Sequence, residues 1–257
     1  MDLKLSELRK SASEFAKAGG DLTLNYFKKE YRLEFKNDDS PVTNADREAE
    51  SVIRKLIKEK YPTHGIIGEE FGSENEDCDI VWVLDPIDGT QSFIHGVPFY
   101  TTLIGILVKG EPKVGVIYAP ALNELVSAAI GEGCTLNGKE CKVRRCDNLD
   151  EATFLTTEVS TFEEYNHFDA FKELLGKIRL HRTWGDAYGH LMVATGRADI
   201  MIDPILNIWD AAALLPIVTE AGGSYTDLNG QPKIETGNAL STNNVLKDHI
   251  LPLFETK

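Results

Sequence analysis

Two aspartates and a threonine follow an apolar run early in the chain, and together they suit a divalent cation. The run covers residues 81–84 and is followed by Asp85, Asp88 and Thr90. Carboxylate oxygens are hard ligands of the kind that Mg²⁺ prefers. Gly89 lets the backbone turn tightly and present N–H groups to a phosphate. Because an Asp-Pro turn after a strand would also explain these residues, the segment alone leaves both a metal site and a plain turn open.

Two further groups of acids adjoin apolar segments elsewhere in the chain. Glu69 and Glu70 follow the short run of residues 66–68, and Asp210 opens an apolar stretch that continues to Ala221. Active sites are commonly assembled from the ends of elements that lie far apart in the sequence. The three groups together therefore favour a metal site over three unrelated turns.

These segments resemble the Mg²⁺-dependent, lithium-sensitive phosphatases of the inositol monophosphatase family. The resemblance is carried, in the family's order and spacing, by residues 40–46, 68–70, 82–90 and 209–223. It implies an α+β fold, the family's layered αβαβα sandwich, and the hydrolysis of small phosphate monoesters. Within the family, residues 185–189, 194–199 and 203–207 look most like the histidinol-phosphate phosphatase branch, which acts in histidine biosynthesis.

The resemblance also implies a role for each candidate residue of the reaction centre. Two to three Mg²⁺ ions are expected on four carboxylates and one backbone carbonyl, those of Glu69, Asp85, Asp88, Asp210 and Ile87. The expected catalytic residues are Asp46, Thr90 and Glu69, with Asp46 orienting Thr90 so that this pair activates the attacking water.

Several of these residues have a second explanation. Thr43 and Asp46 have the spacing of a helix capping box, and Asp210 suits a helix N-cap, a role compatible with metal binding. Glu70 could be a solvated neighbour of the metal ligands. Lys36 could be a surface charge, or it could neutralise metal-bound water or phosphate.

A separate set of residues is expected to contact the substrate. By resemblance this set comprises Gly89, Thr90, Gly185, Asp186, Ala187, Asp203 and Asn207. Histidinol phosphate carries an amine and an imidazole, and carboxylates such as Asp186 and Asp203 would pair with them. Salt bridges or turns would explain the same two acids.

Other functions fit the residues less well. A haloacid-dehalogenase-type phosphatase would need one residue between its two acids, whereas two residues separate Asp85 from Asp88. A non-catalytic metal or phosphate sensor should lack part of the apparatus, and no part is missing. Inositol phosphates and sugar or nucleotide phosphates remain alternative substrates, because one catalytic core can serve many pockets.

Length, charge and hydropathy limit the architecture and the partners. A chain of 257 residues with 42% apolar residues can form one large core. We expect one compact fold of two halves, 1–147 with most metal ligands and 148–257 completing the site. The net charge of −14 disfavours nucleic acid as a partner. With no long apolar run and no signal-peptide core at the start, we expect a cytoplasmic protein without a membrane partner. The resemblance implies a homodimer.

Hydrophobic periodicity predicts the main elements. Strands are expected over residues 101–108, 114–118, 154–155 and 200–202, and a hairpin over 125–143 that turns at Asn137-Gly138. Helices are expected over residues 8–26, 44–60, 162–175, 188–195 and 210–220.

Overall fold

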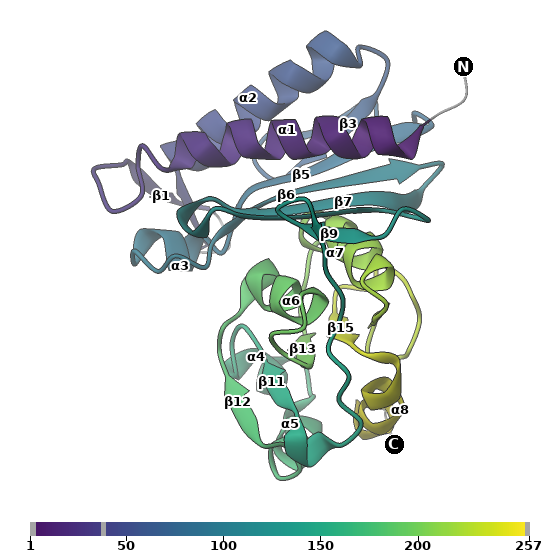
Figure 1. Cartoon of the computed structure of the whole chain (residues 1–257). Helices are drawn as coiled ribbons and strands as arrows, with labels where there is room; N and C mark the ends of the chain where they lie inside the picture. The colour runs from purple at the N-terminus through teal and green to yellow at the C-terminus, as the bar shows by residue number, and fades with distance from the viewer. Residues whose placement is uncertain (1–3, 37–39, 255–257) are drawn as a thin grey trace.

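The computed structural model describes residues 4–36 and 40–254, in which two large sheets alternate with three layers of helices (Figure 1). The larger sheet has eight strands in the order β10-β9-β8-β7-β6-β5-β3-β4. The smaller has five in the order β12-β11-β13-β15-β14, and β1 and β2 form a separate ribbon. Both large sheets are mixed, since each contains parallel and antiparallel pairs.

The elements follow one another along the chain in two groups. The helices are α1 (Leu5–Thr23), α2 (Asn44–Lys60), α3 (Thr90–Ile94), α4 (Ser160–Glu164), α5 (Phe168–Leu175), α6 (Asp186–Ala194), α7 (Ile208–Glu220) and α8 (Asn244–Phe254). The strands up to the middle of the chain are β1 (Leu33–Phe35), β2 (Pro41–Thr43), β3 (Gly65–Gly68), β4 (Gly72–Glu74), β5 (Ile80–Asp88), β6 (Thr101–Val108), β7 (Glu111–Ala119), β8 (Glu124–Ala129), β9 (Cys134–Leu136) and β10 (Lys139–Glu140). The later strands are β11 (Thr153–Leu155), β12 (Leu180–Arg182), β13 (Ile200–Asp203), β14 (Ser224–Thr226) and β15 (Ala239–Thr242).

Strand β5 shows why the larger sheet is covered on both faces. Successive side chains of a strand point to opposite faces. Trp82 and Leu84 lie in the core formed with α1 and α2, whereas Val81 and Val83 lie in the core formed with α6 and α7. An apolar run without polar alternation is thus what a strand between two helical layers requires.

Helix α7 lies unusually close to the larger sheet, and glycines allow this approach. A Cβ atom on Gly115 of β7 would lie 2.1 Å from the carbonyl oxygen of Ala213, and one on Gly105 of β6 would lie 2.6 Å from the Ala212 Cβ. The small side chains on both sides let the helix rest on the strands. This packing fixes the start of α7, where Asp210 lies, relative to the end of β5.

The smaller sheet completes the layers. Its apolar residues pack on α4, α5 and α8 through a cluster that includes Phe154, Phe162, Phe171 and Leu246. The order α1/α2, larger sheet, α6/α7, smaller sheet, α4/α5/α8 is the predicted αβαβα sandwich (Figure 1). Because α7 follows residue 148 in sequence but packs on the earlier sheet, the division into halves 1–147 and 148–257 stays a prediction.

The local predictions were partly right. The helix over residues 44–60 and the strand over residues 101–108 are confirmed. The single helix expected over 162–175 is wrong, because the chain breaks into α4 and α5 at Asn166, whose φ is 61°. The hairpin expected over 125–143 is a three-stranded arrangement of β8, β9 and β10, in which Asn137-Gly138 joins the last two strands.

Some elements near the end of the chain were not predicted. Helix α8 and strands β14 and β15 come from segments without a strong periodic pattern. None of the helices in the described ranges combines the length and apolar character needed to cross a bilayer. Residues 1–3, on which the expectation of no signal peptide partly rests, lie outside those ranges.

Candidate active site

A bulge in β5 brings Asp85 and Asp88 together. Asp85 pairs with Leu103 of β6 and Asp88 with Thr101, so β5 contains one more residue than β6 between these two pairs. In a regular strand, residues three apart face opposite sides, and an extra residue corrects this. With Asp210 of α7, the two acids form a group in which one carboxylate oxygen of each residue lies within 4.8 Å of the others. We call Asp85, Asp88 and Asp210 the acidic cluster.

Hydrogen bonds from the protein hold each member of the acidic cluster. The backbone N–H of Ile87 donates to Asp85 Oδ1 (3.0 Å), and that of Asn207 donates to Asp210 Oδ2 (2.7 Å). Asp88 Oδ2 accepts the Ala187 N–H at 2.8 Å and the Thr101 hydroxyl at 3.0 Å. The N-cap residue of α7 is Asn207, so the expectation that Asp210 is the N-cap is wrong by three positions. Asp210 is the third residue of the helix and closes a capping box by accepting the Asn207 N–H, which is compatible with its place in the acidic cluster.

The electrostatics of the acidic cluster favour a bound cation. Burial, reinforced by the neighbouring acids, raises the pKa values of Asp85 and Asp88 well above those of an ordinary aspartate. Burial also raises the pKa of Asp210 to about 6, although hydrogen bonds from Asn207 and Asp85 oppose the shift. Grouped buried carboxylates are costly to ionise unless positive charge is present. All the donors are oxygens, which fits Mg²⁺.

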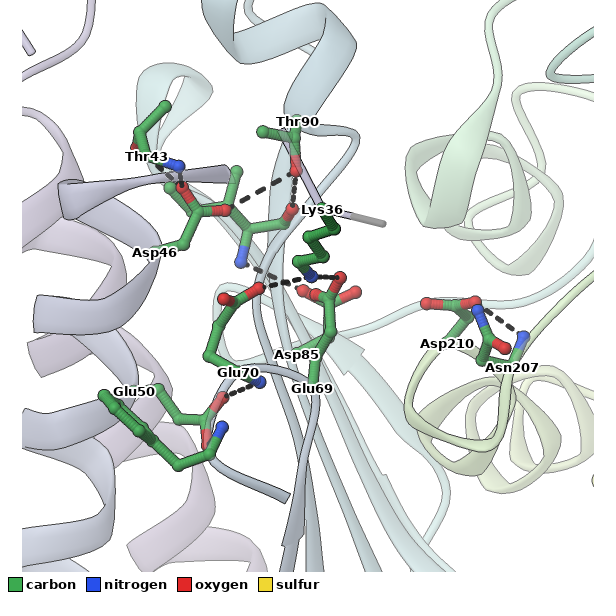
Figure 2. Close-up of polar contacts among 12 residues, drawn as sticks. Lys36, Thr43, Asp46, Glu50, Glu69, Glu70, Asp85, Thr90, Asn207 and Asp210 are labelled. Atoms are coloured by element: carbon green, nitrogen blue, oxygen red, sulfur yellow. Dashed lines mark hydrogen bonds and ion pairs between the residues drawn. The ribbon is translucent and has the colours of Figure 1, made fainter. Parts of the chain in front are cut away.

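Glu69 and Glu70, which follow β3, face one another across Lys36 (Figure 2). The Lys36 Nζ atom lies 2.7 Å from an Oε1 atom of each glutamate. Burial alone would lower the pKa of Lys36, but the hydrogen bonds to the two glutamates outweigh it and raise the pKa. Only 3% of the Glu70 side chain is exposed, so Glu70 is not a solvated neighbour. Lys36 is likewise not a free surface charge.

Asp46 serves the helix cap and faces Thr90 at the same time (Figure 2). Its Oδ2 atom accepts the Thr43 N–H (2.8 Å) and hydroxyl (2.6 Å), as in a capping box. Its Oδ1 atom lies 3.5 Å from the Thr90 hydroxyl, which also lies 3.1 Å from the Ile87 carbonyl oxygen. Burial raises the pKa of Asp46 to about 7 against the effect of the Thr43 bonds. The two explanations of Asp46 thus describe different oxygens of one carboxylate.

Asp186 begins α6 in a strained left-handed conformation, with φ at 53°. Its N–H donates to the Thr157 hydroxyl at 2.8 Å. The preceding residue, Gly185, packs so closely on Thr157 that a Cβ atom there would lie 2.3 Å from the Thr157 Cα, which leaves room only for glycine. Gly89, with φ at 81°, leaves room for the Asp186 carboxylate, which would lie 2.7 Å from a Cβ at that position. Burial raises the pKa of Asp186 to about 7, and Asp203 and Asp210 add to this.

Asp203 is engaged by the protein through both carboxylate oxygens. Oδ1 accepts the Thr157 N–H at 3.2 Å, and Oδ2 lies 3.1 Å from Nε2 of His190, which is fully buried. His190 in turn contacts Ser241 through Nδ1 at 2.7 Å. These contacts are those of a structural acid, although Asp203 also lines the cavity described next.

Two adjoining cavities contain most of the candidates. A cavity of about 250 Å³ lies beside the acidic cluster and is also lined by Glu69, Ile87, Asp203 and Asn207. A second, of about 550 Å³, is lined by Gln91, Ser92, Phe99, Thr183 and Gly185. Both are lined by Glu69, Gly89, Thr90, Thr157, Glu158 and Asp186. The structure therefore provides a small acidic chamber that opens beside a larger and more mixed one.

Sequence reasoning missed some residues of this site. Thr157 and Glu158 follow strand β11 in a loop without a recognisable motif. Glu50 of α2 binds backbone N–H groups after Glu69, and its pairing with Arg54 four residues later was the one available signal. Ala187, predicted as a substrate contact, gives its N–H to Asp88.

Comparison with known proteins agrees with this geometry. The model of the inositol monophosphatase family matches residues 4–257. The chain is 41% identical over 242 residues to a histidinol-phosphatase of Chlorobaculum parvum, with 93% of each protein covered. It is 33% identical over 265 residues to an inositol monophosphatase of Mesembryanthemum crystallinum, covering 99% of this chain and 98% of the relative.

Solved structures agree as well. The extragenic suppressor protein suhB of Bartonella henselae superposes with a TM-score of 0.91 at 26% identity, covering 97% of this chain and 99% of that one. Both the family match and the relatives extend over the two cavities and the acidic cluster. The chain therefore belongs to the inositol monophosphatase family of phosphatases.

Proposed function

We propose that this phosphatase is Mg²⁺-dependent and acts on histidinol phosphate. The observation that carries the proposal is the joined pair of cavities, in which the acidic cluster adjoins Asp186 and Glu158. A phosphate monoester would place its phosphate in the smaller cavity and its organic group in the larger. The relative from Chlorobaculum parvum, named a histidinol-phosphatase, supports the choice of substrate.

The residues that would hold two to three Mg²⁺ ions are the acidic cluster, Glu69 and the Ile87 carbonyl. Bound there, the ions would neutralise charge on the phosphate oxygens and stabilise the leaving alkoxide. Lys36 would balance the charge of Glu69 and Glu70. The N–H groups of Gly89 and Thr90, which line both cavities, are proposed to bind the phosphate.

Thr90 and Asp46 are proposed to activate the attacking water. A water proton would pass to the Thr90 hydroxyl oxygen while the Thr90 proton passes to Asp46 Oδ1, 3.5 Å away. A general base works best with a pKa near the working pH, and burial raises the pKa of Asp46 to about 7. The water oxygen would attack phosphorus directly, so no covalent intermediate on the protein is needed.

The organic part of histidinol phosphate requires negative partners for its amine and imidazole. Asp186 and the more exposed Glu158 line the larger cavity, and both are carboxylic acids. Charge-assisted hydrogen bonds to them would be stronger than bonds between neutral groups. Asp203 and Asn207 are proposed to contact the substrate from the smaller cavity.

A phosphate-release assay tests this function. Histidinol phosphate, inositol 1-phosphate, fructose 1,6-bisphosphate and 3′-phosphoadenosine 5′-phosphate would be compared with Mg²⁺ and with a chelator. We expect the highest kcat/KM for histidinol phosphate and no release with the chelator. A much higher kcat/KM for inositol 1-phosphate would replace the proposed substrate, and no Mg²⁺-dependent release from any of the four would favour a non-catalytic metal or phosphate sensor.

We also propose the homodimer that the resemblance implies. Sedimentation at micromolar concentration would test it, and a monomer would contradict it. The cytoplasmic location stays a prediction.

A further inference from the structure

Glu50 is a fully buried carboxylate outside the acidic cluster. It lies on α2 with no exposed surface, and its Oε1 atom accepts a hydrogen bond from Arg54 Nε at 2.7 Å. Buried charges normally need a partner and further hydrogen bonds. The apolar residues Ala49, Ile53 and Ile57 already bury α2 against α1 and the sheet. The contacts of Glu50 therefore call for a role beyond attaching the helix.

The remaining contacts of Glu50 go to the turn that carries Glu69 and Glu70. The Glu70 N–H donates to Glu50 Oε2 at 2.8 Å (Figure 2). The Phe71 N–H donates to Glu50 Oε1 at 3.3 Å. The Glu69 N–H donates to the Leu84 carbonyl of β5 at 3.1 Å. All three backbone N–H groups of the turn between β3 and β4 are thereby fixed.

Gly68 makes this contact possible. A Cβ atom at Gly68 would lie 2.1 Å from Glu50 Oε1, so any other residue would displace the carboxylate. Arg54 binds the far end of the same turn, donating to the Gly72 carbonyl and lying 3.7 Å from Glu74. The Glu50–Arg54 pair thus contacts the turn from Glu70 to the start of β4, immediately after Glu69 in the sequence.

We propose that the Glu50–Arg54 pair is a positioning device that sets the affinity of the site for Mg²⁺ by fixing the backbone of Glu70 and Phe71, directly after Glu69. The inference rests on the metal site of the proposed function. The pair touches neither cavity, so it acts through the two glutamates and not on the substrate. Groups that orient metal ligands typically change metal affinity by 10–100-fold when they are altered.

Glu50→Gln is the main test, because it keeps the shape of the side chain but removes the charge that pairs with Arg54. Titration calorimetry of the metal-free protein with Mg²⁺ should show binding weakened about tenfold or more. In the phosphate-release assay, the Mg²⁺ concentration for half-maximal activity should rise by a similar factor, while kcat at saturating Mg²⁺ stays within about twofold of wild type.

Glu48→Gln is the matched control. Glu48 lies on the same helix, but it is exposed and contacts Tyr26 and Asn44 instead of the turn. Its Mg²⁺ affinity should equal that of wild type. If Glu50→Gln lowers the Tm of the metal-free protein but leaves the Mg²⁺ affinity within twofold, the pair is merely structural and the proposal fails.

Arg54→Lys decides the question if Glu50→Gln does not fold. Lysine keeps the charge but lacks the planar guanidinium that reaches Glu50 and Gly72 together. We therefore expect the same loss of Mg²⁺ affinity, and an unchanged affinity would overturn the proposal.

Calorimetry needs no substrate, so it separates this proposal from the proposed activity. If wild type binds Mg²⁺ but cleaves no ester, the proposed activity fails alone; if wild type binds no Mg²⁺, both proposals fail.

Discussion

The two sides of the site are built by different means. One side, which we call the strand side, consists of Glu69, Asp85 and Asp88 at the ends of β3 and β5 in the larger sheet. The other, the helix side, consists of Asp186 and Asp210 at the starts of α6 and α7. On the strand side, Asp85 is held locally by the bulge and by the Ile87 N–H, whereas Asp88 and Glu69 are also held by groups distant in the sequence, the Ala187 N–H and the Lys36 ammonium. The helix side depends on where two helices are packed.

This difference suggests a division of labour. The strand side supplies three of the four proposed metal-binding carboxylates, which any phosphate monoester would need. Asp186 of the helix side rests on Thr157 and lies over Gly89, so its position can vary with the loop that follows β11. We therefore expect changes on the strand side to affect all substrates alike, and a change at Asp186 to affect some substrates more than others.

The largest effect is expected on the strand side, from Asp88→Asn. The substitution would remove one carboxylate from the acidic cluster and with it part of the proposed stabilisation of the transition state by bound metal. Loss of one preorganised electrostatic group typically lowers turnover by about 10²–10³-fold. We expect kcat to fall at least about 10²-fold for histidinol phosphate and for inositol 1-phosphate, measured by phosphate release at saturating Mg²⁺.

Asp169→Asn is the control for that measurement. The Asp169 side chain is 99% exposed on α5 and pairs only with Lys172 among the described salt bridges, so turnover should not change. Near-normal activity of Asp88→Asn at saturating Mg²⁺ would show that the acidic cluster is not the metal site.

The same contrast explains what the sequence could predict. Asp85 and Asp88 could be singled out because they lie in one short motif that follows an apolar strand, and the resemblance that this and other motifs carry implied their roles and the αβαβα fold. The sequence could not show that Asp46 both closes the capping box and contacts the Thr90 hydroxyl. The capping-box spacing does not reveal where the second carboxylate oxygen of Asp46 points, so from the sequence alone capping and contact with Thr90 are alternatives. Thr157 and Glu158 could not be predicted, because their place in the cavities depends on the packing of the smaller sheet against the larger.

A smaller effect, which depends on the substrate, is expected from Asp186→Ala. The change would remove the proposed charge-assisted contact with the amine or imidazole, worth about 1.5–3 kcal/mol, so KM for histidinol phosphate should rise roughly tenfold or more. A small neutral phosphate ester should be affected far less. Each variant and substrate would be measured by steady-state phosphate release, with wild type alongside.

Comparing two substrates in one enzyme provides the control for Asp186→Ala. General damage to the fold would raise KM or lower kcat for both esters by similar factors. An equal loss for both would make Asp186 a structural acid and would remove the distinction between the two sides.

The smallest effect is expected on the stability of the metal-free protein. Burial raises the pKa of Asp46 to about 7, of Asp186 to about 7 and of Asp210 to about 6, against about 3.9 in an unfolded chain. Since each pKa is raised on folding, these three acids contribute fully to the free energy of unfolding below about pH 4, where they are protonated in both states. This contribution is lost as the pH rises through about 6 to 7. In a chelator, Tm should therefore fall from pH 5 to pH 8 by about 5 °C or more, taking roughly 2–4 °C per kcal/mol at this size.

Calorimetric scans of wild type and Asp186→Asn would measure the fall, and the asparagine should reduce it because it cannot ionise. Saturating Mg²⁺ should also reduce the fall, since bound cations favour the ionised carboxylates. A Tm that rises with pH in the chelator would mean that these buried acids are already ionised without metal, and the acidic cluster would then need no cation to balance it.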